Sequence, residues 1–471
     1  MSRAVDAVDR RAVVIGGSLG GIFAAAALSA GGWAVTLLER DQLPAGAEHR
    51  RGVPQDRQAH ILLHRGLTAI EGLLPGFRAE LVARDAVPFD TGRMPWLGEY
   101  GWLSTDVSSW EVVSATRPLM DAVARDLLRR LPRMTVRDGV RVTGLKPTPD
   151  GWRVCAEQVG ATDADGRSGL LDDFAASVVV DASGRSSRLD HWLPTLGGAD
   201  EEVVDAMVGY AGRLHVARRE IPFDTGLAIF GLVPDGASGL ALPVEGGQWM
   251  ISASGMGDSR PPRDSDGFEA FLAGLRDPAV TDLVSCLEPV GDVAVHRQTA
   301  NHRRAWGSRQ DWPPGLLVVG DALCSFNPIY GQGITVAALQ AELLRDHLST
   351  GRPVDRRLQL TVRAATDVPW AISTGNDQKF LDQTITASRL SRLTSGYSSR
   401  LARLGATGHV RAGATLSNIY HLMSPPSALF HPALLLAAAR PLSHRQLPRP
   451  AVLDELSRRR REHPPPARAD A

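Results

Sequence analysis

The segment that most constrains the fold is an apolar run followed at once by glycines and then by a second apolar run. Residues 12–15 read Ala-Val-Val-Ile, and Gly16-Gly17-Ser18-Leu19-Gly20-Gly21 comes directly after them. Residues 22–30 are rich in Ala, and residues 35–38 read Val-Thr-Leu-Leu, a second largely apolar run. Short all-apolar runs are typical of strands buried on both faces. The order predicts a β-α-β unit and a parallel sheet.

The glycine cluster has the spacing and context of a dinucleotide-binding turn. Gly16 allows a tight turn, Gly21 allows close packing of helix and strand, and Ser18 is small enough for a pyrophosphate to approach the backbone. The N-terminus of the next helix offers N–H groups and partial positive charge to that anion. Such turns also occur for packing alone, so this motif by itself leaves both interpretations open.

A carboxylate at the end of the second predicted strand strengthens the dinucleotide hypothesis. Glu39 stands 23 residues after Gly16, where a carboxylate can accept both ribose hydroxyls of an adenosine. It disfavours an NADP 2′-phosphate at this position. The alternative interpretation is a solvated charge at a strand end.

A second motif, some 300 residues later, indicates which dinucleotide is bound. Residues 317–321 end in Gly320-Asp321, and residues 327–333 read Asn-Pro-Ile-Tyr-Gly-Gln-Gly before a predicted helix. Asp321 could hold ribityl hydroxyls, and the N–H groups at Gly333 and Ile334 would point at the N1/C2=O edge of an isoalloxazine. NAD has no ribityl chain, so the pair of motifs favours FAD. A plain strand–turn–helix of the sheet is the alternative.

The rest of the sequence predicts two kinds of region, one with helices and buried strands and one with short alternating strands. A helix is expected at 118–131, a hairpin at 136–145 and 152–158, buried strands at 178–180 and 316–319, and a long helix at 333–348. Short alternating strands between about 203 and 300 indicate an antiparallel sheet, and the last hundred residues look mostly helical. Residues 41–110 look irregular.

The amino-acid composition makes several kinds of binding partner and metal site unexpected. The formal net charge is zero, so nucleic acid is a poor partner. Three scattered cysteines predict neither a disulfide framework nor a zinc site, and the histidines show no metal-ligand spacing. No apolar run reaches the ~20 residues of a membrane span, and residues 434–439 read as helix core rather than as an anchor. A cleaved leader after Arg10-Arg11 is disfavoured by the glycines that follow, so a cytoplasmic protein is expected.

Together these motifs resemble the class A flavoprotein monooxygenases, the fold of p-hydroxybenzoate hydroxylase. Arg117, in Ala115-Thr-Arg-Pro-Leu119, matches that family's helix-start Arg, which contacts FAD. The family's middle motif, usually Asp-Gly, is here Asp181-Ala-Ser-Gly184. That motif is linked to nicotinamide use, so the departure leaves the choice of NADPH, NADH or a separate reductase open.

Within that class the chain is similar to flavin epoxidases that act on polyether-precursor polyenes. The similar segments are Arg51-Gly-Val-Pro-Gln-Asp-Arg-Gln-Ala-His60, Leu73-Leu-Pro-Gly76, Pro243-Val-Glu-Gly-Gly-Gln-Trp249, Gly320–Gly333 and Pro425-Pro-Ser-Ala-Leu429. The resemblance implies reduction of FAD by NAD(P)H, addition of O2 to give a C4a-hydroperoxide, and epoxidation of an alkene in a lipophilic natural-product precursor. The implied cofactor-binding set is Gly16, Ser18, Leu19, Gly21, Glu39, Arg40, Arg51, Arg117, Val140, Asp321, Pro328, Gly331, Gly333 and Ile334.

The implied fold is α/β, with a Rossmann-like FAD-binding domain, an inserted, mainly antiparallel β substrate domain and a helical C-terminal region. The expected division is 1–60, 110–200 and 295–350 for FAD, 61–109 and 201–294 for substrate, 351–457 for the helical region, and 458–471 for a disordered tail. The loops near 85–110 and the sheet of 203–300 are expected to form an apolar pocket over the flavin.

Other functions stay open at this point. They are an aromatic hydroxylase, a flavin reductase that saturates double bonds, and a prenyl-binding relic of the fold without turnover. A halogenase is disfavoured because the Trp-x-Trp-x-Ile-Pro motif is absent and neither Lys146 nor Lys379 has a suitable context. No catalytic side chain is assigned: His60 and Gln55 would lie near the flavin, but nothing in the sequence makes either an acid or a base, and alkene epoxidation needs neither.

Overall fold

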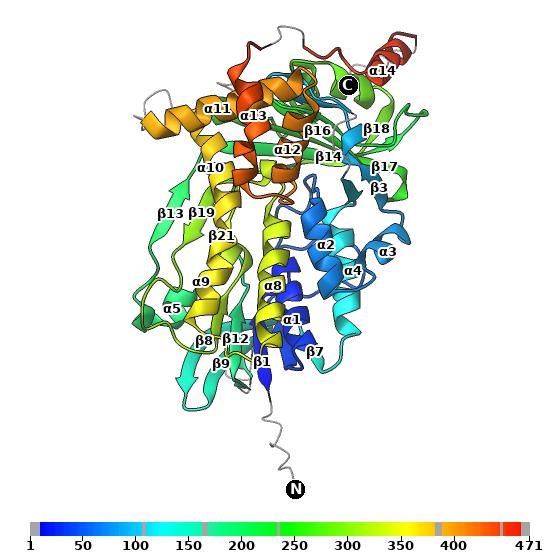
Figure 1. Cartoon of the computed structure of the whole chain (residues 1–471). Helices are drawn as coiled ribbons and strands as arrows, with labels where there is room; N and C mark the ends of the chain where they lie inside the picture. The colour runs from blue at the N-terminus through cyan, green and yellow to red at the C-terminus, as the bar shows by residue number, and fades with distance from the viewer. Residues whose placement is uncertain are drawn as a thin grey trace.

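The computed structural model describes residues 10–105, 110–162, 168–171, 173–232, 236–381, 389–442 and 446–462. A parallel sheet and its helices form one half of the molecule, and a large, mainly antiparallel sheet with the C-terminal helices forms the other (Figure 1). The helix α10 (Asp367–Leu381) runs along the side of the molecule from one half to the other (Figure 1).

The parallel sheet has the strand order β20-β12-β1-β2-β7. Its strands are β1 (Arg11–Ile15), β2 (Ala34–Leu38), β7 (Met134–Arg137), β12 (Val178–Asp181) and β20 (Leu316–Val318). All four pairings are parallel, which confirms the predicted β-α-β unit. The expectation that residue 136 begins the hairpin is wrong, because Val136 pairs with Leu37 in this sheet.

Helices cover this sheet and explain its apolar strands. They are α1 (Leu19–Ala30), α2 (His64–Leu73), α3 (Phe77–Val82), α4 (Arg117–Arg129), α8 (Gly333–Ser349) and α9 (Arg356–Ala364). The expected irregularity of residues 41–110 is wrong for α2 and α3. Leu67, Ile70 and Phe77 share the core cluster of the parallel sheet, so these helices lie with that sheet rather than with the expected substrate domain.

Two small sheets and a short helix flank the parallel one. The predicted hairpin is β8 (Val140–Thr148) with β9 (Gly151–Thr162), extended by β10 (Ser168–Leu170) and β11 (Phe174–Ala176). The second has β13 (Glu201–Val204), β19 (Asn301–Arg304) and β21 (Cys324–Ser325). The helix is α5 (Leu189–Trp192).

The large sheet has the order β18-β14-β17-β16-β15-β4-β5. Its strands are β4 (Trp96–Gly98), β5 (Gly101–Trp102), β14 (Val208–Ala217), β15 (Leu227–Ile229), β16 (Ser238–Val244), β17 (Gln248–Met256) and β18 (Leu287–His296). Every pairing is antiparallel except that of β4 with β15. Helices α6 (Ser265–Ala273) and α7 (Ala279–Val284) pack on it, and β3 (Val87–Asp90) pairs with β6 (Glu111–Ser114) beside it.

The C-terminal region is helical, as predicted. After α10 it contains α11 (Arg389–Ala406), α12 (Val410–Tyr420), the 3₁₀ turn η7 (Pro426–Phe430), α13 (Pro432–Ala439) and α14 (Ala451–Glu462). The expected tail from residue 458 overlaps α14, because Arg460 pairs with the buried Asp282 and holds the last turn. Residues 463–471 lie outside the described part. No described helix is long and apolar enough to cross a membrane.

Candidate active site

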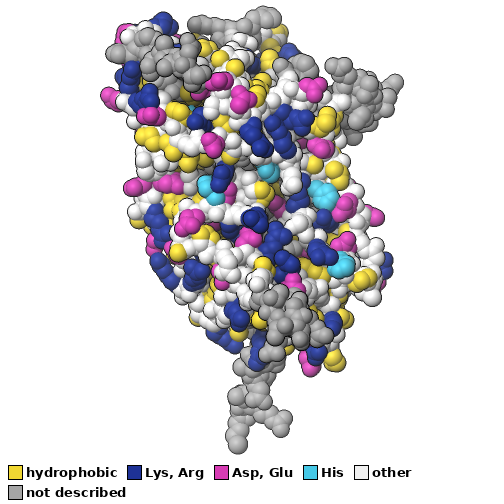
Figure 2. All heavy atoms as spheres, turned by 180° about the vertical axis from the view of Figure 1, so that it is seen from behind, with side chains coloured by type: hydrophobic (Ala, Val, Ile, Leu, Met, Phe, Trp, Pro, Cys, Tyr) yellow, Lys and Arg dark blue, Asp and Glu magenta, His cyan; other side chains and the backbone are white. Residues whose placement is uncertain are grey.

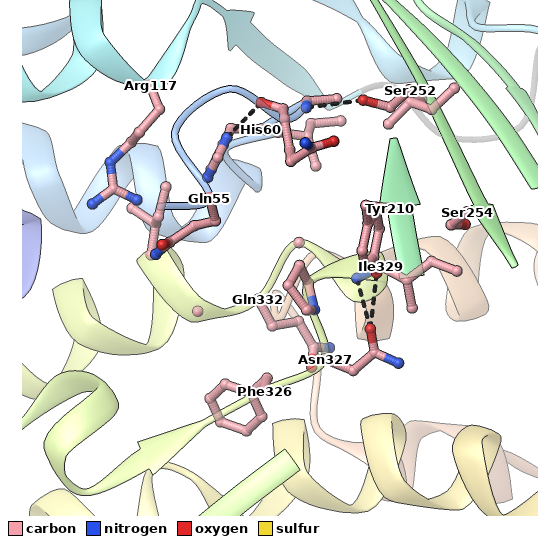
Figure 3. Close-up of a pocket in the computed structure, with 18 of the residues that line it drawn as sticks. Gln55, His60, Arg117, Tyr210, Ser252, Ser254, Phe326, Asn327, Ile329 and Gln332 are labelled. Carbon is pink, nitrogen blue, oxygen red and sulfur yellow. Dashed lines mark hydrogen bonds between the residues drawn. The ribbon is translucent and has the colours of Figure 1, made fainter. Parts of the chain in front are cut away.

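A cavity that is partly open to solvent lies between the parallel and the antiparallel sheet. Side chains near the ends of the parallel strands and on β14 and β17 of the antiparallel sheet line it (Figure 3), and Tyr420 of α12 joins them. Eight predicted cofactor residues reach it: Ser18, Leu19, Arg117, Asp321, Pro328, Gly331, Gly333 and Ile334. Six do not line it: Gly16, Gly21, Glu39, Arg40, Arg51 and Val140. Two segments about 300 residues apart therefore meet at one cavity, as the sequence predicted.

The glycine-rich turn is built by close backbone packing. Gly16 has a φ of 104°, in the region that favours glycine, and a Cβ there would clash with the carbonyl of Ala182, which directly follows the neighbouring strand β12. A Cβ on Gly21 would clash with the carbonyl oxygen of Gly16. These two glycines bring α1 against the strand ends, which directs the N-terminus of α1 at the cavity.

Arg117 is held beside that N-terminus. It is the first residue of α4, it is buried, and its guanidinium pairs with Asp121 at 2.7 Å. Its second nitrogen donates to the Ser18 hydroxyl at 2.8 Å. The Glu245 carboxylate accepts hydrogen bonds from the Thr116 backbone N–H and hydroxyl, which ties the start of α4 to the antiparallel sheet. A cation is thus fixed where a diphosphate would meet two helix N-termini.

Glu39 lies behind the turn rather than on the cavity wall. Its carboxylate accepts the N–H groups of Gly17 at 2.6 Å and Asp41 at 2.9 Å, and pairs with Arg50 at 3.2 Å. Arg50 is nearly fully buried and also donates to the Gly17 carbonyl, whereas Arg51 is exposed. The prediction named Arg51; the buried partner of this turn is its neighbour, and two adjacent arginines gave no signal for choosing between them.

Arg40 and Val140 also lie beside this turn. The Arg40 side chain is 55% exposed, and the Val140 N–H donates to the Glu39 carbonyl oxygen. Their assignment to cofactor binding stays a prediction.

The segment of residues 320–334 lines another wall of the cavity. Asp321 lies in the 3₁₀ turn η5 (Gly320–Ala322), and its carboxylate has no hydrogen-bond partner among the described residues. Burial raises the pKa of Asp321, while the cations of Arg185 and Arg117 act in the opposite direction. Gln332, just before α8, is 1% exposed, and both its amide oxygen and its amide nitrogen lack a partner within the described chain. The site therefore holds polar groups that only a ligand or water can satisfy.

A buried polar network fixes the loop that carries this wall. The Asp377 carboxylate, on α10, accepts from the Tyr330 hydroxyl at 2.9 Å and from the side-chain amides of Asn327 and Asn301. The Tyr210 hydroxyl donates to Asn327 at 2.8 Å (Figure 3). Burial raises the pKa of Asp377. The sequence reasoning missed Asp377 and Tyr210, because no local pattern marks a side chain whose partners lie about 50 or more residues away.

These groups fit FAD. The N-termini of α1 and α8 both face the cavity, with Arg117 near the first and the unpartnered Asp321 and Gln332 near the second. Helix N-termini suit a diphosphate and the N1/C2=O edge of a flavin, and a carboxylate acceptor suits ribityl hydroxyls.

His60 lines the same cavity in a defined protonation state. Its Nδ1 lies 2.8 Å from the Gln58 carbonyl oxygen, which can only accept, so Nδ1 carries the hydrogen and Nε2 is left as an acceptor. Burial, with the neighbouring charge of Arg117, lowers the pKa of His60 to about 4. The ring points into the cavity near Arg117 (Figure 3). The structure thus supplies a neutral acceptor that the sequence alone did not indicate.

One end of the cavity is apolar and aromatic. Trp96 of β4 stacks on Phe230 with ring centroids 5.1 Å apart, and Tyr420 of α12 meets Trp96 edge-on at 5.6 Å. Met94 and Leu240 complete this wall. The loops near 85–110 and the antiparallel sheet form an apolar wall, as expected. The contribution of Tyr420 was not expected, because its helix lies more than 300 residues beyond Trp96 in the chain.

The Asp181-Ala-Ser-Gly184 motif uses its carboxylate for hydrogen bonds to serines that follow it closely in the sequence. The Asp181 carboxylate accepts from the Ser183 N–H and hydroxyl and from the Ser187 hydroxyl, at 2.6 to 3.0 Å. Asp181 is fully buried, and burial raises its pKa. Its contacts close the turn after β12. Among the described residues no cluster of His, Cys, Asp or Glu could hold a metal ion.

Solved structures with a similar fold include flavin-dependent enzymes. The chain superposes on the flavin-dependent brominase Bmp2 triple mutant with a TM-score of 0.60 at 15% identity, covering 91% of this chain and 99% of that one. It superposes on p-nitrophenol 4-monooxygenase PnpA from Pseudomonas putida DLL-E4 with a TM-score of 0.59 at 16% identity, covering 88% and 99%. The OxyS anhydrotetracycline hydroxylase from Streptomyces rimosus gives 0.53 at 17% identity, covering 88% and 76%. The fold is therefore that of the p-hydroxybenzoate hydroxylase-type FAD-dependent monooxygenases and halogenases.

Sequence comparison places the chain in a narrower group. It is 34% identical over 349 residues to Protein Rv3254 of Mycobacterium tuberculosis (strain ATCC 25618 / H37Rv), covering 71% of this chain and 72% of that protein. The chain belongs to the family of Protein Rv3254. No family model matches it.

Proposed function

We propose that this protein is an FAD-dependent monooxygenase that oxidises a lipophilic small molecule. The observation that supports this proposal is that one cavity is lined both by polar groups that suit a flavin and by an aromatic wall. The parallel-sheet half, including α2 and α3, would bind the cofactor, and the antiparallel sheet with the C-terminal helices would bind the substrate.

Charged, polar and aromatic residues of the cavity would have different roles in binding. Arg117 and the α1 N-terminus would bind the diphosphate, Asp321 the ribityl hydroxyls, and the N–H groups at Gly333 and Ile334 the pyrimidine edge of the flavin. FAD, reduced by NADPH or NADH, would supply the activated oxygen. Trp96 and Tyr420 would hold an apolar substrate and keep water away from the reacting atoms.

Within this class we propose epoxidation of an alkene as the reaction. The aromatic end of the cavity carries no charged side chain among the described residues, which suits a hydrocarbon segment of a substrate. Oxygen transfer to an alkene needs no protein base.

Hydroxylation of a phenol is a second candidate, favoured by His60. Its neutral ring presents Nε2 as an acceptor to the cavity, where it could take the proton of a phenol. The His60→Gln variant separates the two reactions. It should leave an epoxidation rate nearly unchanged, but should lower kcat for a phenol by roughly 10²-fold, within the usual range for loss of a general base.

Halogenation has less support. Lys146 lies in the β8–β9 hairpin, paired with Arg153, and no lysine is found among the described side chains that line the cavity. Lys379 belongs to α10, and its side chain lies outside the described part.

The test is direct. The purified protein should be yellow with bound FAD, should oxidise NAD(P)H faster when a suitable polyene is present, and should place one atom of labelled O2 in the product, as read by mass spectrometry. A protein that stays colourless after incubation with FAD would contradict the proposal. A saturated product without label would indicate a reductase instead.

A further inference from the structure

Five large apolar side chains are exposed along α12, α13 and the segment between them. They are Val410 at 64% exposure, Met423 at 36%, Phe430 at 56%, Leu435 at 45% and Leu436 at 65%. Residues 434–439 were expected to be helix core, and that expectation is only half correct. Leu434 and Ala438 are buried, whereas Leu435 and Leu436 face solvent.

This exposure is unusual for such a helix. An α-helix that is apolar on all its faces is normally buried on all of them. The buried side of α13 packs in a small cluster with Leu401 and Leu404 of α11, so its other side has no protein cover within the described chain. Helices α11, α12 and α13 lie together at the end of the molecule that holds the antiparallel sheet (Figure 1).

The charge of this region is one-sided. The chain as a whole has 52 basic and 52 acidic residues, yet residues 383–453 contain eight Arg and no Asp or Glu. Of these eight, Arg449 is paired with Asp277 and Asp454, which lie outside that stretch. Arg411 and Arg440, on α12 and just after α13, are exposed and have no carboxylate partner among the described residues. On the opposite side of the molecule, by contrast, basic and acidic side chains are interspersed (Figure 2).

We propose that Val410, Met423, Phe430, Leu435 and Leu436, with Arg411 and Arg440, form an apolar–basic surface that binds the face of an anionic lipid bilayer. Apolar side chains enter the boundary between headgroups and acyl chains, and arginines gain from the negative surface potential. In this proposal the protein lies on the bilayer, and no helix in the described part of the chain is long and apolar enough to span it.

A bilayer explains the surface better than a second copy of the chain does. A symmetric dimer through this surface would bring the arginines of both copies into one interface, with no carboxylate in residues 383–453 to pair with any of them. The surface also adjoins the cavity, because α12 carries Val410 at one end and the cavity residue Tyr420 at the other. Delivery of a membrane-dissolved substrate through α12 would rest on the proposed function; bilayer binding itself does not.

The test uses the full chain and vesicles. Sedimentation with vesicles of phosphatidylcholine and phosphatidylglycerol should retain the protein at least about tenfold more strongly than vesicles of phosphatidylcholine alone, since each arginine near an anionic surface contributes. Added salt should weaken the binding, because the charges are exposed. Equal or absent retention by both vesicle types would overturn the proposal.

Variants locate the surface. Leu435→Ser with Leu436→Ser should lower vesicle binding at least about tenfold, and Arg411→Gln with Arg440→Gln should remove the preference for phosphatidylglycerol. Val203→Ser with Val290→Ser is the matched control, because it removes two other exposed apolar side chains, on β13 and β18. Full binding by the leucine variant would overturn the proposal, as would a wild-type dimer that this variant dissociates. FAD content should be equal in all of these variants, so failure here is separate from failure of the proposed function.

Discussion

The Arg117 guanidinium donates a 2.8 Å hydrogen bond to the Ser18 hydroxyl, which joins the starts of two helices 99 residues apart in the chain. Ser18 stands at the N-cap of α1, and Arg117 is the first residue of α4. Ser18 does not cap its own helix with its side chain. Its hydroxyl is used to hold a cation beside the free N–H groups of α1, and this arrangement suits an anion at the edge of the cavity.

Removal of that cation should weaken FAD binding. In Arg117→Ala the proposed diphosphate site loses a charge-assisted contact, which typically contributes about 1.5–3 kcal/mol, so the dissociation constant of FAD should rise roughly 10- to 100-fold. Flavin absorbance per protein after gel filtration, with a titration of the apoprotein, measures this. Arg218→Ala, on the exposed edge of the antiparallel sheet, is the control. Equal flavin occupancy in both variants would remove Arg117 from the site.

Two neighbouring glycines should respond differently to the same change. Gly21→Ala places a methyl group against the Gly16 carbonyl oxygen, whereas a Cβ on Gly20 would lie 3.7 Å from Ala337, in ordinary contact. We expect Gly21→Ala to lower the free energy of unfolding by at least about 3 kcal/mol, because overpacking here must displace backbone. Gly20→Ala should change it by less than about 1 kcal/mol. Urea denaturation of both variants checks the pair; similar unfolding free energies would contradict the packing described for α1.

The buried Asp377 should matter more than its distance from the cavity suggests. In Asp377→Ala, the Tyr330 hydroxyl and the Asn301 and Asn327 amides lose their acceptor. Three buried groups are left unsatisfied at about 1–3 kcal/mol each, so the free energy of unfolding should fall by at least about 3 kcal/mol. The loop of Pro328 and Gly331 should loosen, and bound FAD should dissociate faster at temperatures where the variant is still folded.

Two further variants test that assignment. Asp377→Asn keeps one acceptor oxygen and should recover part of both losses. Asp367→Ala, on an exposed turn of the same helix, should keep nearly the wild-type free energy of unfolding and FAD dissociation rate. Should Asp377→Ala release FAD at the wild-type rate, Asp377 would be structural only.

Stability should fall as the pH is lowered below 6.5. Burial lowers the pKa of His60, His215 and His421 to about 4, so each is neutral in the folded protein at pH values where the unfolded chain already binds a proton. The unfolded state then binds more protons, and each histidine removes up to about 1.4 kcal/mol of unfolding free energy per pH unit between 6.5 and 4. Urea midpoints between pH 7.5 and 5 measure the slope.

His215→Gln isolates one of these contributions. His215 is buried in β14 and does not line the cavity, so its replacement should reduce the slope without a change in FAD content. An unchanged slope in this variant would contradict the neutral state inferred for His215.

Local pattern was enough for most of the fold. The strands of residues 12–15, 35–38 and 178–180 are apolar except for Thr36, because both faces of the sheet are covered. Neighbouring residues in the sequence are therefore enough to indicate this burial. Pattern failed where an element is short or its partner is remote. Residues 134–137 alternate like a hairpin strand, but pair with β2, and α2 lies in a stretch whose glycines and prolines suggested loops.

By itself the sequence determined the α/β class, the glycine-rich turn and the late Asp321–Ile334 motif, because each depends on the order and spacing of neighbouring residues. Only the tertiary structure decided that Arg50 rather than Arg51 is buried beside Glu39. It further decided that Asp377 holds the loop of residues 327–333 and that His60 presents a free Nε2 to the cavity. It also decided that Leu435 and Leu436 face outward. Burial, protonation and hydrogen-bond partners arise from segments that meet only after folding, and no single stretch of chain contains both partners.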